Sequence, residues 1–288
     1  MSIDVSSQAD KAARLRELHH LSEPLVLVNA WDAVSARIVE SLGFPAVATG
    51  SAGVAYVHGY ADGEKIGRDE MLRAVAEITR VVRVPVTADL EAGYGSSPED
   101  AAATVRGAIA AGAVGLNFED ASGDPQRPLF RIQDQVERIR AIRAVGDALG
   151  VPIVINARTD VFLAHAYEND DDGIAQTVER AKAYIAVGAD SIFVPGVSKP
   201  ELITQLVKAI DAPLNVLAGA ATPPVGELRR LGVHRISLGS GTIGYVLAMF
   251  KDIALEVRDH GTFGFLADRI SHADLNALFS DVPSTGNP

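Results

Sequence analysis

The stretch Val84-Pro-Val-Thr-Ala-Asp-Leu-Glu-Ala-Gly-Tyr-Gly95 delivers two acids to the end of a buried strand. Apolar and polar residues alternate with the period of two typical of a β-strand, and the polar positions become acidic only at Asp89 and Glu91. Two glycines then permit a sharp turn, and Ser96-Ser-Pro-Glu99 is typical of a helix cap and first turn. Inward-facing carboxylates are costly unless they are hydrogen-bonded, paired or bound to a cation, and oxygen ligands suit magnesium. The alternative interpretation is a pair of solvated loop acids.

The composition indicates one large globular domain. The chain has 288 residues, of which 48% are hydrophobic and 22% charged, with a mean hydropathy of +0.15. A net charge of −11 and a pI near 5.1 argue against a nucleic-acid groove and an anionic membrane surface. The sequence has no cysteine, which excludes disulfides, thiolate ligands and a cysteine nucleophile. No apolar run could span a bilayer and Met1 to Leu21 is unlike a secretory signal, so we expect a cytoplasmic protein.

One pattern repeats along the whole chain: a short apolar run, a loop and a helical segment. The strand candidates are Leu25–Asn29, Ala46–Gly50, Val84–Glu91, Gly115–Glu119, Ile153–Arg158, Ser191–Pro195, Leu214–Ala218 and Arg235–Leu238. Helical segments are expected near 33–42, 69–82, 98–111, 131–149, 171–187, 199–210, 223–231 and 242–259, several ending in a glycine: Gly43, Gly112, Gly150, Gly188 and Gly232. The fold class is therefore α/β, and right-handed crossovers between these units predict a closed (β/α)₈ barrel of the TIM type. An open doubly wound sheet is the weaker alternative, because no Gly-x-Gly-x-x-Gly turn follows the first strand.

We expect a single barrel domain over residues 1–288. Residues 1–22 would form an N-terminal segment, frayed to residue 8 and helical from Ala9 to Leu21. Residues 262–288 would form an apolar helical appendage that has no place inside a closed barrel. Such an appendage commonly packs on a neighbouring subunit, so we expect a homo-oligomer.

Polar residues gather where the predicted strands end, which is where barrel enzymes place their chemistry. They are Asn29, Trp31, Asp32, Gly50–Gly53, Asp89, Glu91, Glu119, Asp120, Asn156, Arg158, Asp160, Asn215 and Gly239–Gly241. The set predicts an acidic, cation-seeking site with one fixed anion receptor, Arg158. Simpler interpretations remain open: Glu119-Asp120 could cap a helix, and Arg158 could pair with Asp160 or Glu119. The turn Gly239–Gly241 could grip a phosphate or simply be tight.

From about Leu25 to Ile253 the sequence resembles the isocitrate lyase/phosphoenolpyruvate mutase superfamily. The matching blocks are Asn29-Ala-Trp-Asp-Ala-Val-Ser-Ala-Arg-Ile38, Thr49-Gly-Ser-Ala52, Asp89-Leu-Glu-Ala-Gly-Tyr-Gly95, Asn117-Phe-Glu-Asp120 and Asn156-Ala-Arg158. Their order and spacing nearly cover the predicted barrel. The family's helix-swapped dimers, assembled into tetramers, would explain the C-terminal appendage.

The resemblance implies a magnesium site, with manganese as the alternative ion. Asp89 matches the acid that contacts the ion most directly. Glu91, Glu119 and Asp62 match acids that hold the ion, the first two largely through its waters.

The resemblance also implies a binding site for a small carboxylate substrate. Ser51 and Ala52 match a turn whose backbone amides bind the substrate's carboxylate or keto oxygen, and Arg158 matches an arginine that pairs with a substrate carboxylate. With Asp89, the expected substrate-binding set also includes Thr49, Gly50 and Asn215. The residues expected to carry catalysis are Arg158, Ser51 and Glu119.

The segment after Glu119-Asp120 departs from the family pattern. It reads Ala121-Ser-Gly-Asp-Pro-Gln-Arg-Pro128, without the Lys-Lys-Cys-Gly-His loop of the isocitrate and methylisocitrate lyases and without the lysine of the phosphonate enzymes. Isocitrate lyase and phosphoenolpyruvate mutase activities are therefore disfavoured.

The compatible chemistry is magnesium-dependent cleavage of a carbon–carbon bond in a small 2-oxo or 2-hydroxy acid through a stabilised enolate. Decarboxylation of an oxaloacetate-like acid needs no strong base. Cleavage of a 2-hydroxy diacid needs one, and Asp124, Tyr56 and Tyr94 remain open candidates. The alternatives are an oxaloacetate or phosphonopyruvate hydrolase, a 2-oxo acid binder with little catalysis, and a phosphate-binding barrel enzyme.

Overall fold

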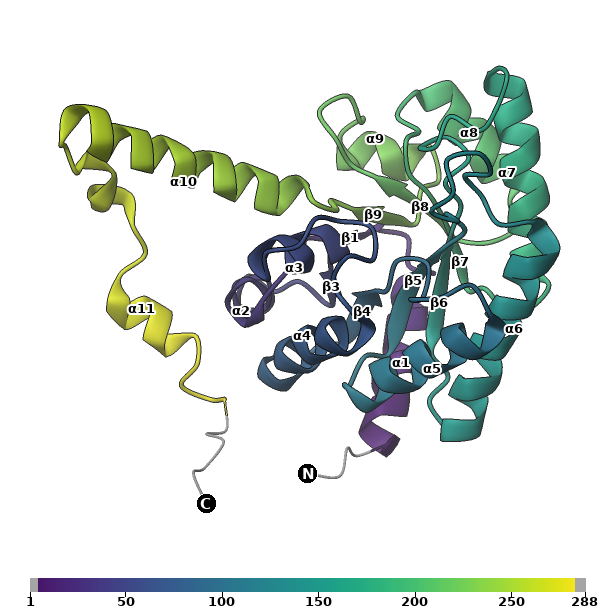
Figure 1. The fold of residues 1–288 in the computed structure, drawn as a ribbon, viewed down its shortest axis with the longest axis horizontal. Helices are drawn as coiled ribbons and strands as arrows, with labels where there is room; N and C mark the ends of the chain where they lie inside the picture. Colours follow the sequence, from purple (N-terminus) through teal and green to yellow (C-terminus); the bar gives the residue numbers. More distant parts are fainter. Residues whose placement is uncertain (1–4, 283–288) are drawn as a thin grey trace.

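The computed structural model describes residues 5–282, in which strands and helices alternate along the chain (Figure 1). The strands are β1 (Leu25–Leu27), β2 (Asn29–Ala30), β3 (Val47–Thr49), β4 (Val86–Asp89), β5 (Gly115–Glu119), β6 (Val154–Arg158), β7 (Ser191–Val194), β8 (Leu214–Leu217) and β9 (Arg235–Ser237). The helices are α1 (Val5–Leu18), α2 (Ala33–Ser41), α3 (Ser51–Val57), α4 (Arg68–Val81), α5 (Pro98–Ala110), α6 (Ile132–Leu149), α7 (Asp170–Ile185), α8 (Pro200–Ala209), α9 (Val225–Arg230), α10 (Gly241–His260), the 3₁₀ helix η1 (Gly264–Asp268) and α11 (His272–Ala277).

The barrel is completed through its first strand, which Val28 divides into β1 and β2. β1 pairs in parallel with β9, Leu25 lying opposite Arg235, while β2 pairs in parallel with β3. The remaining neighbours are also parallel, in the order β1-β9-β8-β7-β6-β5-β4-β3-β2. The predicted (β/α)₈ barrel is confirmed.

The strands are buried on both faces, because helices cover the outside and side chains fill the inside. All four residues of β4 are buried, as are all four of β7. α1 joins the same core: Leu15 is fully buried, and Gln8 donates hydrogen bonds to the carbonyls of Ile109 and Ala113, just before β5. These contacts place α1 at the amino-terminal end of the barrel, which leaves the carboxyl-terminal end for the site (Figure 1).

Two local expectations need correction. Residues 5–8, expected to be frayed, belong to α1, and residues 1–4 lie outside the described part of the chain. Ser51–Val57 was expected to begin as a turn, yet it forms helix α3 with Gly50 as its N-cap. This short helix has five buried residues in succession, so no polar stripe marks it in the sequence. The five glycines expected to end helices all have positive φ and confirm those helix ends.

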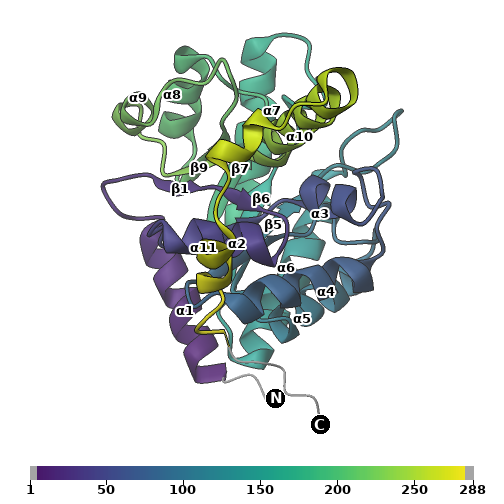
Figure 2. The ribbon, with the colours of Figure 1, turned by 90° about the vertical axis from the view of Figure 1, so that its left-hand side faces the viewer.

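α10 was expected to be the eighth barrel helix, but Figure 1 shows it projecting away from the barrel, and in Figure 2, where that side faces the viewer, it lies in front of the barrel. Only Ile243 of its twenty residues is buried. After η1 and α11 the chain returns to its own barrel, where Arg37 donates to the carbonyl of Leu278 (2.6 Å) and Phe279 packs on the core. We call residues 244–277 the arm. Within residues 5–282, no helix is long and apolar enough to cross a membrane.

Candidate active site

A cavity of about 230 Å³ lies where the strands end at their carboxyl termini. It is lined by Asn29, Gly50, Ser51, Ala52, Asp62, Asp89, Asn117, Arg158, Leu163, Phe193, Leu217, Ser237, Gly239 and Ser240. Its ionisable lining residues are Asp62, from the loop before α4, Asp89, from the end of β4, and Arg158, from the end of β6. The fold therefore brings together residues from distant parts of the sequence, as expected for a barrel of this class.

Asp89 is fixed through its backbone N–H and one carboxylate oxygen, while its other carboxylate oxygen has no partner among the described residues. As the last residue of β4 it donates its backbone N–H to the Thr49 hydroxyl (2.8 Å), and its Oδ2 accepts the backbone N–H of Ser51 (3.0 Å). Its Oδ1 is buried and has no hydrogen-bond partner among the described residues. A buried carboxylate oxygen without a partner is costly unless a ligand or cation satisfies it.

Glu91 is oriented by Glu64, a residue of the neighbouring loop that the sequence analysis did not identify. Its Oε2 accepts the backbone N–H of Glu64 (2.5 Å), while the Glu64 carboxylate accepts the N–H of Tyr94 (2.6 Å). The Tyr94 hydroxyl also lies 3.4 Å from Glu91 Oε1. Burial, followed by the charges of Asp89 and Asp62, raises the pKa of Glu91 to about 7. The one signal for Glu64 in the sequence is the acid–glycine–acid run that begins at Asp62.

Arg158 is engaged on every side by carboxylates. Its Nη1 lies 2.7 Å from Glu119 Oε2, and its Nε and Nη2 contact the two oxygens of Asp160 at 2.6 and 2.7 Å. Burial opposes the charge, but Glu119 and Asp160 outweigh it and hold the pKa of Arg158 above its ordinary value. Both pairings left open by the sequence are present.

Asp120 supports the ion pairs of Arg158 by binding the backbone of Asp160. It is fully buried, accepts the backbone N–H of Asp160 (2.9 Å) and contacts Arg180 (3.1 Å) and the hydroxyl of Tyr184 (2.7 Å). The interpretation of Glu119-Asp120 as a helix cap is wrong, because α6 begins only at Ile132.

The other expected site residues divide between the lining and the layer behind it. Gly50, Ser51 and Ala52 line the cavity. Thr49 and Asn215 are fully buried, and they bond to the Asp89 N–H and to Ser237 (3.1 Å), respectively. Glu91 and Glu119 also lie outside the lining set.

The turn at Gly239 is held by Asn29. The Asn29 side-chain oxygen accepts the N–H groups of Leu238 (2.9 Å) and Gly239 (2.8 Å), and its amide nitrogen donates to the carbonyl of Thr49 (2.7 Å). These amides are therefore engaged within the protein, which favours the tight-turn interpretation over a phosphate grip.

The oxygen donors at the cavity fit a largely hydrated magnesium ion. Asp89 offers a buried oxygen without a partner, and Asp62 and Glu91 are close enough to Asp89 for its charge to raise the pKa of each carboxyl group, after the larger effect of burial. Across residues 5–282, no three His, Cys, Asp or Glu side chains meet closely enough to hold an ion directly. Magnesium commonly uses one or two carboxylates and keeps several waters, so the two observations agree.

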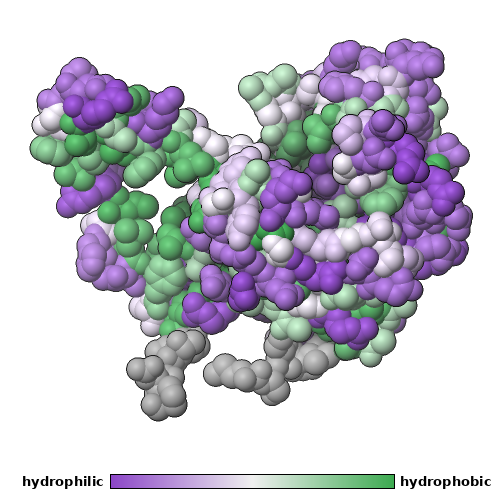
Figure 3. Space-filling model, viewed as in Figure 1, coloured by the Kyte–Doolittle hydropathy of each residue, from purple (hydrophilic) through white to green (hydrophobic). Residues whose placement is uncertain are grey.

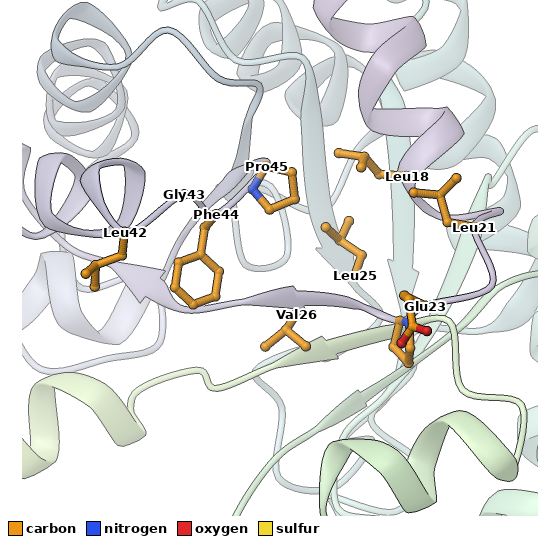
Figure 4. A pocket seen from close by; sticks show the side chains of 10 residues that line it. Leu18, Leu21, Glu23, Leu25, Val26, Leu42, Gly43, Phe44 and Pro45 are labelled. Carbon is orange, nitrogen blue, oxygen red and sulfur yellow. The ribbon is translucent and has the colours of Figure 1, made fainter.

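A second hollow, of about 310 Å³, is lined by residues from the end of α1, from β1 and from the loop before β3 (Figure 4). Its lining is mostly apolar, and Glu23, the one ionisable residue in it, pairs with Arg229 (2.6 Å). None of the expected site residues lines it. The cavity at the strand ends is therefore the candidate active site.

Comparison with known proteins assigns the family. The phosphoenolpyruvate phosphomutase family model matches residues 15–258. The 2-methylisocitrate lyase of Escherichia coli K12 is 32% identical over 230 residues, 77% of this chain and 74% of the relative. The oxaloacetate decarboxylase of Paraburkholderia xenovorans LB400 is 31% identical over 217 residues, 72% of this chain and 68% of the relative. A solved structure from Burkholderia cenocepacia J2315 shares 37% identity and a TM-score of 0.88, covering 96% of this chain and 97% of that one.

The chain belongs to the phosphoenolpyruvate mutase/isocitrate lyase superfamily. The two relatives named above are lyases, which supports the prediction that this chain is an enzyme of the same class.

Proposed function

We propose that the chain is a magnesium-dependent carbon–carbon lyase for a small 2-oxo acid, and that its favoured reaction is decarboxylation of an oxaloacetate-like acid. The observation that carries the proposal is the unpartnered, buried Oδ1 of Asp89 at the cavity. Asp89, with Asp62, Glu91 and Glu119 around it, would hold the ion. When bound, magnesium supplies positive charge beside the substrate oxygens on which negative charge develops.

The residues at the start of α3 would orient the substrate. Because the Ser51 N–H already donates to Asp89, it fixes that carboxylate, and the N–H of Ala52 remains to donate to the substrate's carboxylate or keto oxygen. Both residues line the cavity in the first turn of the helix, where backbone N–H groups point outward. Donors fixed in this way stabilise developing negative charge without reorganising during the reaction.

The rest of the cavity favours loss of carbon dioxide. Leu163, Phe193 and Leu217 form an apolar part of the lining, and Arg158, the one Lys or Arg in the lining, is already paired with two carboxylates. A substrate carboxylate against these apolar side chains loses its hydration, which disfavours its charged form. It therefore leaves readily as uncharged carbon dioxide. The electron pair of the broken bond stays with the substrate as an enolate, which then takes a proton from water. A tricarboxylic acid would need cations that the lining does not offer.

The test is oxaloacetate turnover by the wild type, Asp89→Asn and Asp89→Ala, followed as pyruvate with magnesium and with a chelator. The rate of decarboxylation by free magnesium is subtracted. We expect both variants to lose at least about 100-fold in kcat/KM and to keep the wild-type melting temperature or exceed it. Asp147→Asn, at an exposed position of α6, serves as the control and should stay active. An active Asp89→Ala enzyme would overturn the proposal.

Product analysis distinguishes the alternatives. Acetate and oxalate in place of pyruvate would indicate a hydrolase. Thermal stabilisation by oxaloacetate without any product would indicate a 2-oxo acid binder.

We also propose that a second copy of the chain covers the arm, giving a homo-oligomer built from dimers. Hydrophobic residues gather along the arm and on the neighbouring face of the barrel (Figure 3). A mainly apolar cavity of about 570 Å³ lies between α2 and the start of α10, beside Trp31, Ile38 and Tyr245. The arm of another copy has the length and apolar character to lie on this surface.

A further inference from the structure

The loop from Ala92 to Gly95 carries no predicted metal ligand, yet side chains from neighbouring helices bond its backbone carbonyls. Arg138 of α6 donates through Nη2 to the carbonyl of Ala92 and to that of Gly95 (3.0 Å). One guanidinium thus bonds both ends of the loop that follows Glu91.

Two further helices hold the middle of the same loop. The Thr104 hydroxyl of α5 donates to the carbonyl of Gly93 (2.7 Å), and Arg68, at the start of α4, donates to the carbonyl of Tyr94 (2.7 Å). Four consecutive carbonyls therefore accept hydrogen bonds from side chains of three helices.

The loop needs this support because its backbone is strained. Glu91 and Tyr94 have φ of 50° and 59°, in the left-handed region that residues with a Cβ avoid. Such a conformation is unfavourable and persists only where the surroundings impose it. The strain falls at Glu91 itself and three residues beyond it.

Arg138 is a costly residue to bury for structural purposes alone. It is fully buried, and the described chain offers it no carboxylate as an ion-pair partner; its Nη1 donates instead to the side chain of Gln135 (2.7 Å). The rings of Phe118 and Phe130 lie 4.7 and 4.2 Å from its guanidinium carbon. Burial lowers the pKa of Arg138 to about 10, so it remains charged at neutral pH. The charged guanidinium group instead donates hydrogen bonds to the carbonyls of the loop that follows Glu91.

We propose that Arg138 is a positioning residue for the metal site: by bonding the carbonyls of Ala92 and Gly95, it holds Glu91 facing Asp89. Thr104 and Arg68 support the same loop. The inference rests on the proposed magnesium site, and it assigns to a residue outside the cavity the task of keeping the acids in place before any ion arrives.

The experiment is a calorimetric titration of magnesium into the full-length wild type, Arg138→Met, Arg138→Lys and Thr104→Val. Loss of a residue that orients metal ligands typically costs 10–100-fold in affinity, so we expect the Kd of Arg138→Met to rise by about that factor. Thr104→Val keeps the side-chain volume and removes one hydrogen bond, and it should show a smaller rise. Arg138→Lys keeps the charge and should recover part of the loss. Arg131→Met, which breaks an exposed ion pair at the start of α6, is the matched control and should bind magnesium normally.

Turnover separates positioning from a general loss of fold. Saturating magnesium should restore most of kcat in Arg138→Met, so the defect appears in the magnesium dependence. If the variants melt at lower temperature while their magnesium Kd stays within about twofold of the wild type, Arg138 is structural only and the proposal is overturned. If Arg138→Met does not fold, Thr104→Val decides alone by the same criterion. A wild type that binds no magnesium would overturn the proposed function and this inference together, which distinguishes it from failure of the inference alone.

Discussion

Thr49 and Asp89 lie on neighbouring strands, and the hydrogen bond between them sets the role of each. Because the fully buried Thr49 hydroxyl accepts the Asp89 N–H, Thr49 orients the acid from behind the cavity. Asn215 has a similar position, bonded to Ser237 beneath the lining. Thr49 and Asn215 were both expected to bind substrate; the structure places them behind the cavity lining, and their contact with substrate stays a prediction.

His19 is the residue through which the barrel should sense acid. It is buried directly after α1, its Nδ1 bonded to the carbonyl of Leu15 (2.7 Å) and its Nε2 facing Arg235 at 3.4 Å. Burial, then the charge of Arg235, lowers the pKa of His19 to about 3; His20 adds to this effect and Asp190 opposes it. The ring therefore stays neutral in the folded protein between about pH 6.5 and pH 3, where the unfolded chain would protonate it.

We predict that His19 makes the protein less stable as pH falls below about 6.5, because the unfolded state then binds a proton that the folded state does not. Between pH 7 and pH 5 the loss should be about 2 kcal/mol. His19→Gln should remove that part of the pH dependence, measured by urea unfolding at both pH values. His20→Gln, at the exposed neighbouring position, should keep the wild-type dependence. Identical slopes in all three proteins would contradict the assignment.

The loop between β4 and α5 shows how closely an element can be fitted. Gly93 has a φ of 91°, and a Cβ there would lie 2.7 Å from the ring of Phe118. Gly123, in the loop before α6, has a φ of 73° with open space around it. Because both glycines have positive φ and only Gly93 has a close neighbour, substitutions at the two positions distinguish backbone strain from steric crowding.

We predict that Gly123→Ala lowers the free energy of unfolding by about 1–2 kcal/mol, because alanine is strained in the left-handed conformation. Gly93→Ala should cost a further 1–3 kcal/mol or so, because Phe118 must move. Denaturant unfolding of the two variants measures the difference. Equal losses would mean that the Phe118 ring yields freely.

The elements and residues found from sequence alone were those with a local pattern. Alternation in Val84–Glu91 located β4 and placed Asp89 at its end, and the repeated units gave the barrel. Arg138 has no such signal, and Glu64 has only the acid–glycine–acid run that begins at Asp62, because their partners lie on loops brought near only by the folded barrel. α3 was missed since burial on all sides leaves no amphipathic stripe.

The arm is the feature of the whole molecule that a local pattern described least well. The apolar periodicity of 242–259 predicted a helix, and α10 confirms it, but the same periodicity suggested that the helix would pack on its own barrel. Instead, Tyr245 and Phe250 are 71% and 65% exposed. Sequence periodicity reports that a face will be buried and does not say by which chain.

We predict that the wild type sediments as a dimer or larger assembly at micromolar concentration, because isolated apolar surfaces of this kind are covered in stable proteins. Tyr245→Ser combined with Phe250→Ser should shift the population to smaller species in analytical ultracentrifugation. Lys251→Ser, at an exposed polar position of the same helix, should leave the assembly unchanged. A monomeric wild type would contradict the prediction.

The pairing of β1 with β9 has a consequence for how the chain folds as it is synthesised. β1 cannot pair until β9, which holds its partner Arg235, has left the ribosome. Until then the nascent sheet has open edges, which attract other strands. Closure between segments so far apart in the sequence is slow, and partly folded chains of this size are prone to aggregate. Translation that stalls before β9 should therefore yield chains that depend on chaperones, whatever the integrity of the strands already made.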